Sequence, residues 1–211
     1  MSSVLTLQSL PLFPLAAVLF PGGLLPLRIF EVRYLDMIGR CHKAGAPFGV
    51  VSLTQGNEVR QPGGGKEAFA TVGTLATITE FEAPRPGLMM IRASGTQRFR
   101  ITASDQLRHG LWVADVERIA ADMAVPIPDD LKITAQALAK LIESLELKVD
   151  SPNHMPLQGP WQLDDCGWVA NRWCELLPLP IQLKQRLMEL QNPLVRLELV
   201  SDVLARTGIA N

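Results

Sequence analysis

The sequence predicts an α+β fold, with strands in its first half and helices in its second half. Two observations predict this division. Up to about residue 120 the apolar residues recur with the short period of strands, and after Ala121 they recur at the spacing of helix faces. The proline-bounded segment 125–128 marks the change as a linker, because the residue before a proline is disfavoured in a helix. We therefore predict a β domain at 1–122 and an α-helical domain at 123–211.

The short-period segments of the first half predict strands that are separated by turns rich in proline and glycine. The predicted strands are 10–15, 18–20, 24–29, 48–53, 72–81, 88–94, 97–103 and 111–119. Turns are predicted at 84–87, 94–95 and 109–110, and a long flexible loop at 54–68. Alternation within 97–103 places Phe99 on one side of its strand, and Arg98 and Arg100 on the other side.

One helix interrupts these strands. It is predicted over 30–44, because Phe30, Tyr34, Ile38 and Cys41 recur at the spacing of a single helical face. Gly45 is a suitable left-handed end for this helix.

The second half predicts four short helices that form a compact bundle. The first carries its apolar face over 133–145, with Asp129 or Asp130 available as its N-cap. The second follows the aspartate pair at 164–165, and the third and fourth begin at Pro180 and Pro193.

The composition favours a cytoplasmic protein that does not bind membranes or attract nucleic acid through its overall charge. Twenty Lys and Arg residues nearly balance 21 Asp and Glu residues, so the formal net charge is -1. Three cysteines without a Cys-x-x-Cys spacing predict neither a disulfide framework nor a zinc site, which fits a reducing compartment. The uncharged run 10–27 is interrupted by several prolines and by Gly22 and Gly23, so it does not predict a membrane helix.

No catalytic, metal or cofactor site is predicted. The glycine run 63–65 before Lys66 lacks the spacing of a phosphate-binding loop. His109, Asp105 and Ser94 supply the residue types of a hydrolase triad, but Ser94 does not lie in a nucleophile elbow. The three histidines are far apart in the sequence, and the aspartate pairs lie where helices begin, so capping explains these pairs.

One basic cluster offers an alternative function. Arg92, Arg98 and Arg100 fall on a predicted hairpin, with Phe99 between the last two, and such a strip is able to contact a phosphate backbone. The competing interpretation is a solvated sheet face, which the balanced net charge favours.

A series of segments, in the same order along the chain, resembles the amino-terminal substrate-binding domain of Lon proteases, the peptidase S16 family. These segments are LPLFPL at 10–15, FPGGLLPLRIFEVRY at 20–34, FGVV at 48–51, VGTLA at 72–76, GTQRFRI at 95–101 and, more loosely, NPLVRL at 192–197. The resemblance implies a PUA-like, mostly antiparallel β-barrel that is crossed by one helix and followed by a C-terminal α-helical bundle.

The resemblance also implies the function. In Lon proteases this domain helps to capture unfolded or tagged proteins, and the sequence up to Asn211 shows no ATPase or peptidase domain. We therefore expect a non-enzymatic binding module without cofactors, whose partner is unfolded or extended polypeptide or another protein. RNA binding by a PUA-like domain with an arginine-rich hairpin is the alternative. The candidate binding residues are Arg28, Glu31, Arg33, Tyr34, Arg92, Arg98 and Arg100. Three of them, Glu31, Arg33 and Arg98, have a structural alternative, which is a partly buried ion-pair set that fixes the helix on the barrel.

Overall fold

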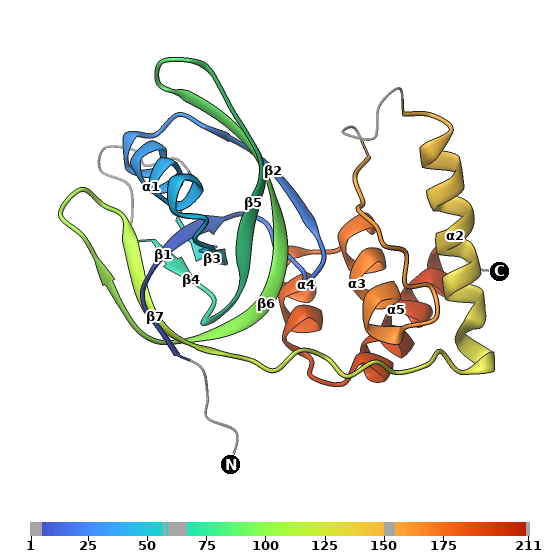
Figure 1. Cartoon of the computed structure of the whole chain (residues 1–211). Helices are drawn as coiled ribbons and strands as arrows, with labels where there is room; N and C mark the ends of the chain where they lie inside the picture. The colour runs from blue at the N-terminus through green and yellow to red at the C-terminus, as the bar shows by residue number, and fades with distance from the viewer. Residues whose placement is uncertain (1–5, 57, 59–66, 150–154, 210–211) are drawn as a thin grey trace. The chain divides into compact units, whose positions relative to one another are not determined.

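The chain divides into two compact units in a computed structural model that describes residues 6–56, 58, 67–149 and 155–209. The first unit, Met1–Ala121, contains the strands and one helix, and is called the β unit below. The second, Asp122–Asn211, contains four α-helices and is called the helical unit (Figure 1).

The β unit is built from a mostly antiparallel sheet. Its strands are β1 (Thr6–Leu15), β2 (Leu24–Ile29), β3 (Phe48–Gln55), β4 (Ala68–Phe69), β5 (Val72–Arg85), β6 (Leu88–Gln106) and β7 (Trp112–Arg118). The strand order is β1-β7-β6-β5-β3-β4, and β2 pairs with β6 outside this path. Because β1 also pairs in parallel with β3, the path β1-β7-β6-β5-β3 returns to its first strand. The prediction of an α+β chain with an antiparallel sheet is therefore confirmed.

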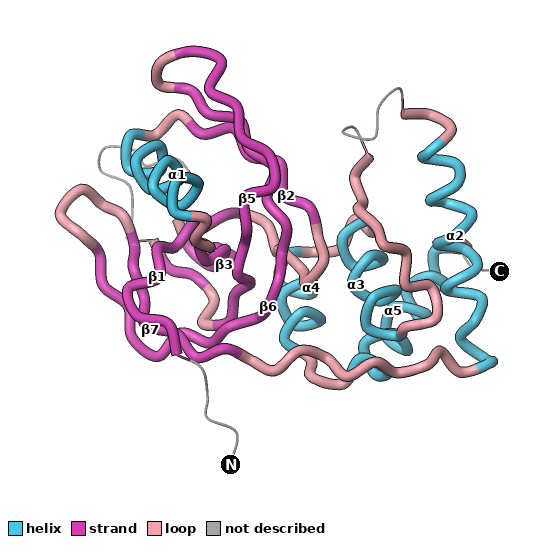
Figure 2. The backbone as a smooth tube through the Cα atoms, in the orientation of Figure 1, coloured by secondary structure: helices cyan, strands magenta, loops and turns pink. Residues whose placement is uncertain are grey.

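The helix of the β unit, α1 (Val32–Ala44), packs one face against this sheet (Figure 2). Met37, Ile38 and Cys41 belong to the same buried cluster as Phe13 and Phe48 of the strands. Gly45 ends the helix with a φ of 60°, and its N–H reaches the carbonyls of the last turn, as predicted. Phe30 does not belong to the buried face, because α1 begins two residues later and 55% of Phe30 is exposed.

Strand β6 runs without interruption through the predicted turn at 94–95, so that prediction was wrong. Gly95 is needed for a close approach and not for a turn: a Cβ on it would lie 2.3 Å from the carbonyl oxygen of Phe20. The backbone of Gly22 and Gly23 exchanges hydrogen bonds of 2.8 and 2.9 Å with Gly95 at this crossing. The segment 18–20 therefore passes over β6 as irregular chain, and the strand predicted there is not formed.

The alternation predicted around Arg98 is confirmed, because Arg98, Phe99 and Arg100 pair in regular register with Thr74, Gly73 and Val72, but the solvated face predicted there was wrong. The pairs Thr74–Arg98 and Ala76–Gly95 show that three steps along β6 face two steps along β5, which is a bulge. Phe99 is buried as predicted, but Arg98 is only 3% exposed, whereas Arg100 is exposed. Arg98 and Arg100 therefore lie on the same side of β6, but only Arg100 is solvated.

The predicted loop 54–68 lies largely outside the described residues, which omit 57 and 59–66. Its ends are more regular than predicted, because β3 extends to Gln55 and the short strand β4 begins at Ala68. β4 pairs with β3 through Leu53 and Phe69.

The helical unit has the four predicted helices. A 3-10 turn at Asp129–Leu131 leads into α2 (Lys132–Glu146), followed by α3 (Cys166–Leu176), α4 (Ile181–Glu189) and α5 (Pro193–Thr207). Helix α3 contacts each of the other three, and most of its residues are buried. Trp173 Nε1 of α3 donates a hydrogen bond of 3.0 Å to the Thr134 carbonyl of α2, which ties these two helices together.

The caps of these helices agree only partly with the predictions. Asp165 caps α3, since its carboxylate accepts the Trp168 N–H at 2.7 Å. Asn192 caps α5 ahead of Pro193. Neither predicted aspartate caps α2: both lie in the 3-10 turn, where Asp129 forms an ion pair of 2.6 Å with Lys132.

None of the helices formed by the described residues is long and apolar enough to cross a membrane. The uncharged run 10–27 forms parts of β1 and β2 instead, as its prolines predicted.

Candidate functional site

Arg33 is the centre of a buried polar cluster in the β unit. Its side chain is 5% exposed, and its Nε lies 3.1 Å from Glu31 Oε2. The guanidinium also contacts Glu67 Oε1 at 3.4 Å, donates to the Gly110 carbonyl at 2.9 Å and lies 4.5 Å from the centre of the Tyr34 ring. The first turn of α1 is thereby attached to the β6–β7 turn and to the chain just before β4.

Aromatic rings surround this cluster and complete its burial. Phe13 stacks on Tyr34 with 4.1 Å between ring centres, and Trp112 Nε1 donates to Glu67 Oε2 at 2.8 Å. Burial raises the pKa of the Tyr34 phenol above its usual value, so the phenol stays protonated near neutral pH. Arg33 and Tyr34 are 7% and 3% exposed, which leaves little of either for a ligand and makes the cluster a structural anchor.

The predicted Glu31–Arg33 ion pair is therefore present, but the sequence did not predict its second acid. Glu67 is 34 positions from Arg33, at the end of the predicted loop, where its role has no signal in local spacing. Arg98 is buried in β6, opposite Thr74 of β5.

The three arginines proposed for RNA contact do not form one exposed strip. Arg92 is paired with Glu80 at 3.5 Å, and its side chain is 20% exposed. Arg98 is buried and Arg100 is exposed. A continuous cationic surface for a phosphate backbone is thus missing from this part of β6.

Three large apolar side chains are exposed where β2 leads into α1. Phe30 is 55% exposed, Val32 is 81% exposed, and Met90 on the neighbouring strand β6 is 47% exposed. Met90 lies opposite Arg28 on β2 and opposite Glu82 on β5, so a charge of each sign flanks it on the same face of the sheet. We call Arg28, Phe30, Val32 and Met90 the β2 corner.

The β2 corner adjoins an edge strand. Among the described strands, β2 pairs with β6 alone. The Gly95 N–H donates to the Gly23 carbonyl, so the backbone groups of Gly23 face β6. Backbone groups alternate in direction along an antiparallel strand, so those of residues 25, 27 and 29 also face β6. The backbone groups of Leu24, Pro26 and Arg28 face the other edge. Pro26 fits this arrangement because it has no N–H to lose on an open edge.

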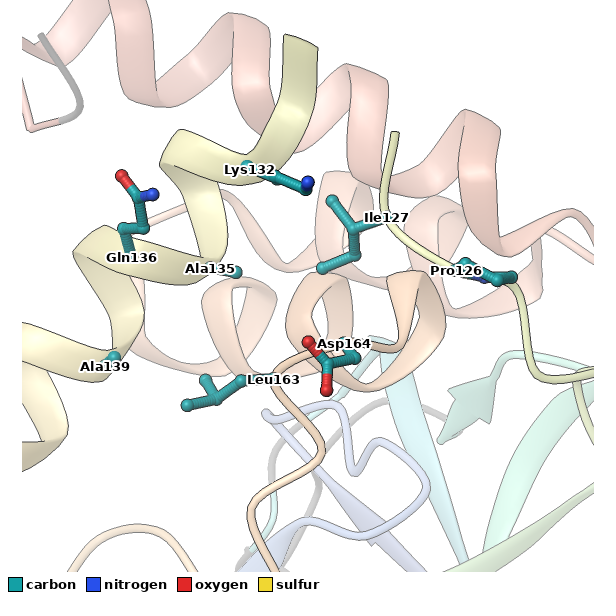
Figure 3. A pocket seen from close by; sticks show the side chains of 8 residues that line it. All are labelled: Pro126, Ile127, Lys132, Ala135, Gln136, Ala139, Leu163 and Asp164. Carbon is teal, nitrogen blue, oxygen red and sulfur yellow. The ribbon is translucent and has the colours of Figure 1, made fainter. Parts of the chain in front are cut away.

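The helical unit contains a pocket of about 340 Å³ (Figure 3). It lies between α2 and two extended segments that pair through Pro126 and Asp165. Apolar side chains and polar side chains both line it. The apolar lining is Pro126, Ile127, Ala135, Ala139 and Leu163, and the polar lining is Lys132, Gln136 and Asp164.

Neither surface resembles a catalytic or metal centre. Ser94 lies near the middle of β6 and Asp105 near its end, separated by about 36 Å of strand path at about 3.3 Å per residue, so they and His109 do not form a triad. The described residues contain no group of three or more His, Cys, Asp or Glu side chains able to hold a metal ion. The glycine run 63–65, Lys66 and His154 lie outside the described residues.

The three cysteines are free and buried, which makes them structural. Burial raises the pKa of each thiol, and that of Cys174 rises to about 12. A protonated buried thiol is a small apolar group with little reactivity.

Sequence reasoning did not predict the exposed residues of the β2 corner. Phe30 was assigned to the buried face of α1, and Val32 was not singled out. A usable signal was present in α2, where Ala135 and Ala139 are small residues four positions apart beside the polar Lys132 and Gln136. Small side chains on the flank of an amphipathic helix leave space that larger ones would fill.

Comparisons with known proteins place the chain in the class of Lon amino-terminal domains. A family model described as the ATP-dependent protease La (LON) substrate-binding domain matches residues 9–206. A crystal structure of a Lon N-terminal domain protein from Xanthomonas campestris is 31% identical, with a TM-score of 0.70 over 93% of this chain and 98% of that one. The N-terminal domain of a Mycobacterium avium complex Lon protease, 18% identical with a TM-score of 0.56, has a similar fold.

The chain belongs to the Lon substrate-binding domain family. Lon protease of Anaeromyxobacter dehalogenans is 27% identical over 93% of this chain, and Lon protease 2 of Myxococcus xanthus is 27% identical over 94%. The chain spans 23% and 24% of the lengths of these two relatives. The family suggested by the motifs of the first half is thereby confirmed.

Proposed function

We propose that this chain is a non-catalytic recognition module that binds unfolded or extended polypeptide, or a protein partner that presents such a segment, at the β2 corner. The observation that carries the proposal is the exposure of Phe30, Val32 and Met90 beside the outer edge of β2. Membership of a substrate-binding domain family supports it. The strand path that returns through the β1–β3 pair further supports a PUA-like barrel, and the two compact units support domains at 1–122 and 123–211.

Extended polypeptide fits this surface for two physical reasons. A segment added along an open strand edge forms main-chain hydrogen bonds that do not depend on its sequence. Its apolar side chains gain free energy when they cover Phe30, Val32 and Met90, at about 25 cal/mol per Å² of apolar surface removed from water. The loss of translational and conformational freedom offsets much of this gain. The expected Kd is therefore in the micromolar range, and a Kd of 1 μM corresponds to a binding free energy of about 8 kcal/mol.

Fluorescence anisotropy of a labelled unfolded polypeptide, measured with the whole chain, tests the proposal. Phe30→Ser combined with Val32→Ser should weaken binding about tenfold, since tenfold corresponds to about 1.4 kcal/mol of lost contact. Leu147→Ser is the matched control, because Leu147 is 89% exposed in the helical unit and should leave the affinity unchanged. Equal affinity of the corner variant and the wild type would contradict the proposal.

A proline scan separates strand addition from apolar contact alone. Arg28→Pro removes an outward N–H while the pairing of β2 with β6 is kept, and Arg28→Ala removes only the side chain. Strand addition predicts that the proline variant binds several-fold more weakly than the alanine variant. The same titrations with a labelled RNA test the alternative: RNA affinity that falls steeply with salt, together with no polypeptide binding, would replace the proposed function.

A further inference from the structure

We propose that the pocket of the helical unit is a second recognition site, which takes a polypeptide segment with an apolar side chain next to a lysine or arginine. The apolar side chain occupies the floor formed by Ile127, Ala135, Ala139 and Leu163, and the cation lies at the carboxylate of Asp164. This inference rests on the proposed function only in taking polypeptide as the source of the ligand.

The walls of the pocket are held in place by hydrogen bonds that do not involve a ligand. On one side, the Ile127 N–H donates to the Asp164 carbonyl at 3.2 Å, and the Cys166 N–H donates to the Val125 carbonyl at 2.9 Å. On the other side, α2 is attached to α3 through Thr134, which is fully buried. A site with fixed walls loses less conformational entropy on binding than one that must first be ordered.

The size of the pocket selects a short segment. Its volume of about 340 Å³ is at the small end of the 300–1,000 Å³ range of ligand pockets, which suits one or two side chains. The space exists because Ala135 and Ala139 stand one helical turn apart on α2, with Gln136 beside them at the rim (Figure 3). A folded protein surface would not enter this volume, whereas a side chain on an extended segment does.

The charges around the pocket select a cation. Lys132 is already paired with Asp129, at 2.6 Å between Nζ and Oδ1. The carboxylate of Asp164 has no ion pair or side-chain hydrogen bond within the part of the chain that the structure describes. The charge of Asp164 also acts on Lys132, but less than that of Asp129, which lies outside the lining and forms the ion pair with Lys132. Asp164 is therefore the lining group able to pair with an incoming ammonium or guanidinium, while the apolar floor accepts the neighbouring side chain.

Two short labelled peptides that differ only in a Leu-Lys or a Leu-Glu pair test this inference by fluorescence anisotropy with the whole chain. The Leu-Lys peptide should bind about fivefold more tightly than the Leu-Glu peptide, and Asp164→Asn should remove this preference. Asp202→Asn, an exposed carboxylate on α5, is the matched charge control and should preserve it. Ala139→Met should weaken binding of the Leu-Lys peptide about tenfold, because the larger side chain fills the floor of the pocket. Lys140→Met places the same side chain at an exposed position and should leave this affinity unchanged.

The corner variant with Phe30→Ser and Val32→Ser separates the two sites. If the Leu-Lys preference persists in that variant and still depends on Asp164, the pocket binds the segment by itself, whatever becomes of the β2 corner. If Asp164→Asn and Ala139→Met leave the affinities of both peptides unchanged, the pocket inference is overturned. This holds even if the corner variant binds unfolded polypeptide more weakly than the wild type. Lysine methyl ester alone should not compete at peptide concentrations, and effective competition by this free amine would overturn the assignment to polypeptide.

Discussion

Replacing Arg33 by methionine should destabilise the β unit, because Arg33 neutralises a carboxylate that would otherwise be buried alone. The Glu67 side chain is 11% exposed, and without Arg33 its remaining side-chain partner among the described residues is Trp112. Breaking a buried ion pair in this way costs about 3–5 kcal/mol. Glu31 is 21% exposed and adds less, since water solvates it better. We expect a loss of about 3 kcal/mol, a large part of the roughly 5–15 kcal/mol that stabilises a domain.

Urea unfolding followed by circular dichroism measures this loss, and hydrogen exchange of peptides from α1 and β7 locates it in the β unit. With an m-value of about 2 kcal/mol/M, 3 kcal/mol lowers the midpoint by about 1.5 M. Adding Glu67→Gln to the Arg33→Met variant should restore about 1 kcal/mol or more, because it removes the uncompensated charge. The folded fraction should bind polypeptide with unchanged affinity, since the Arg33 side chain is buried and does not belong to the exposed β2 corner.

The reasoning would be refuted by a midpoint shift below about 0.5 M, which corresponds to about 1 kcal/mol at the same m-value. It would also be refuted if Glu67→Gln lowered the stability of the Arg33→Met variant further. A fully stable Arg33→Met variant with weakened polypeptide binding would return Arg33 to the binding residues.

Three further predictions concern the helical unit and the thiols. Arg196→Met should cost about 3 kcal/mol by urea unfolding, because Arg196 is 1% exposed and forms a 2.6 Å ion pair with Asp122; a loss below about 1 kcal/mol would show that the pair is dispensable. Burial raises the pKa of Glu175 to about 7, against the opposing charge of Arg172. The folded state then binds this proton more tightly than the unfolded state, so stability is highest below about pH 4.5 and falls as the pH rises through 7, by on the order of 3 kcal/mol. Unfolding midpoints of Glu175→Gln at several pH values should lack this dependence, and an identical dependence in that variant would contradict the assignment. At pH 7.5 a thiol reagent should label none of the buried cysteines in the folded protein and all of them in urea, and rapid labelling without urea would disprove their burial for Cys41, Cys166 and Cys174.

Local signals were sufficient for most elements of the fold. The strand 24–29 and the helix ends at Gly45, Pro180 and Pro193 depend on residues next to one another, and their predictions were confirmed. The period of the apolar residues likewise separated the strand-rich part from the helical part. Such patterns predict the elements correctly because they record which face of each helix or strand is buried.

The errors in the fold have two causes, a contact between distant segments and a competition between local interactions. Gly95 has the chemistry of a turn, but the structure uses it to admit the Phe20 carbonyl. Asp129 was available as a cap for α2, yet it is held by Lys132 within a 3-10 turn. At Gly95 the local preference was overridden by a contact with a distant segment, whereas at Asp129 two local preferences competed and the ion pair with Lys132, three positions on, replaced the cap.

The candidate site divides in the same way. The sequence predicted the Glu31–Arg33 pair, because neighbours at the start of a helix are close in any fold. The burial of Arg98 in β6, and Glu67 as the second partner of Arg33, depend on contacts between strands and across a loop.

The sequence by itself determined the family, the succession of strands and helices, and the net charge, because motifs, apolar periods and composition are properties of neighbouring residues. Tertiary structure alone decided which side chains remain exposed. Phe30 and Val32 are apolar in the sequence like many core residues, and only the register of β2 against β6 and the start of α1 leave them in water. The pocket beside Ala135 and Ala139 likewise exists only because α2 packs next to the paired segments at Pro126 and Asp165, since a cavity depends on distances between chain segments that no local pattern specifies.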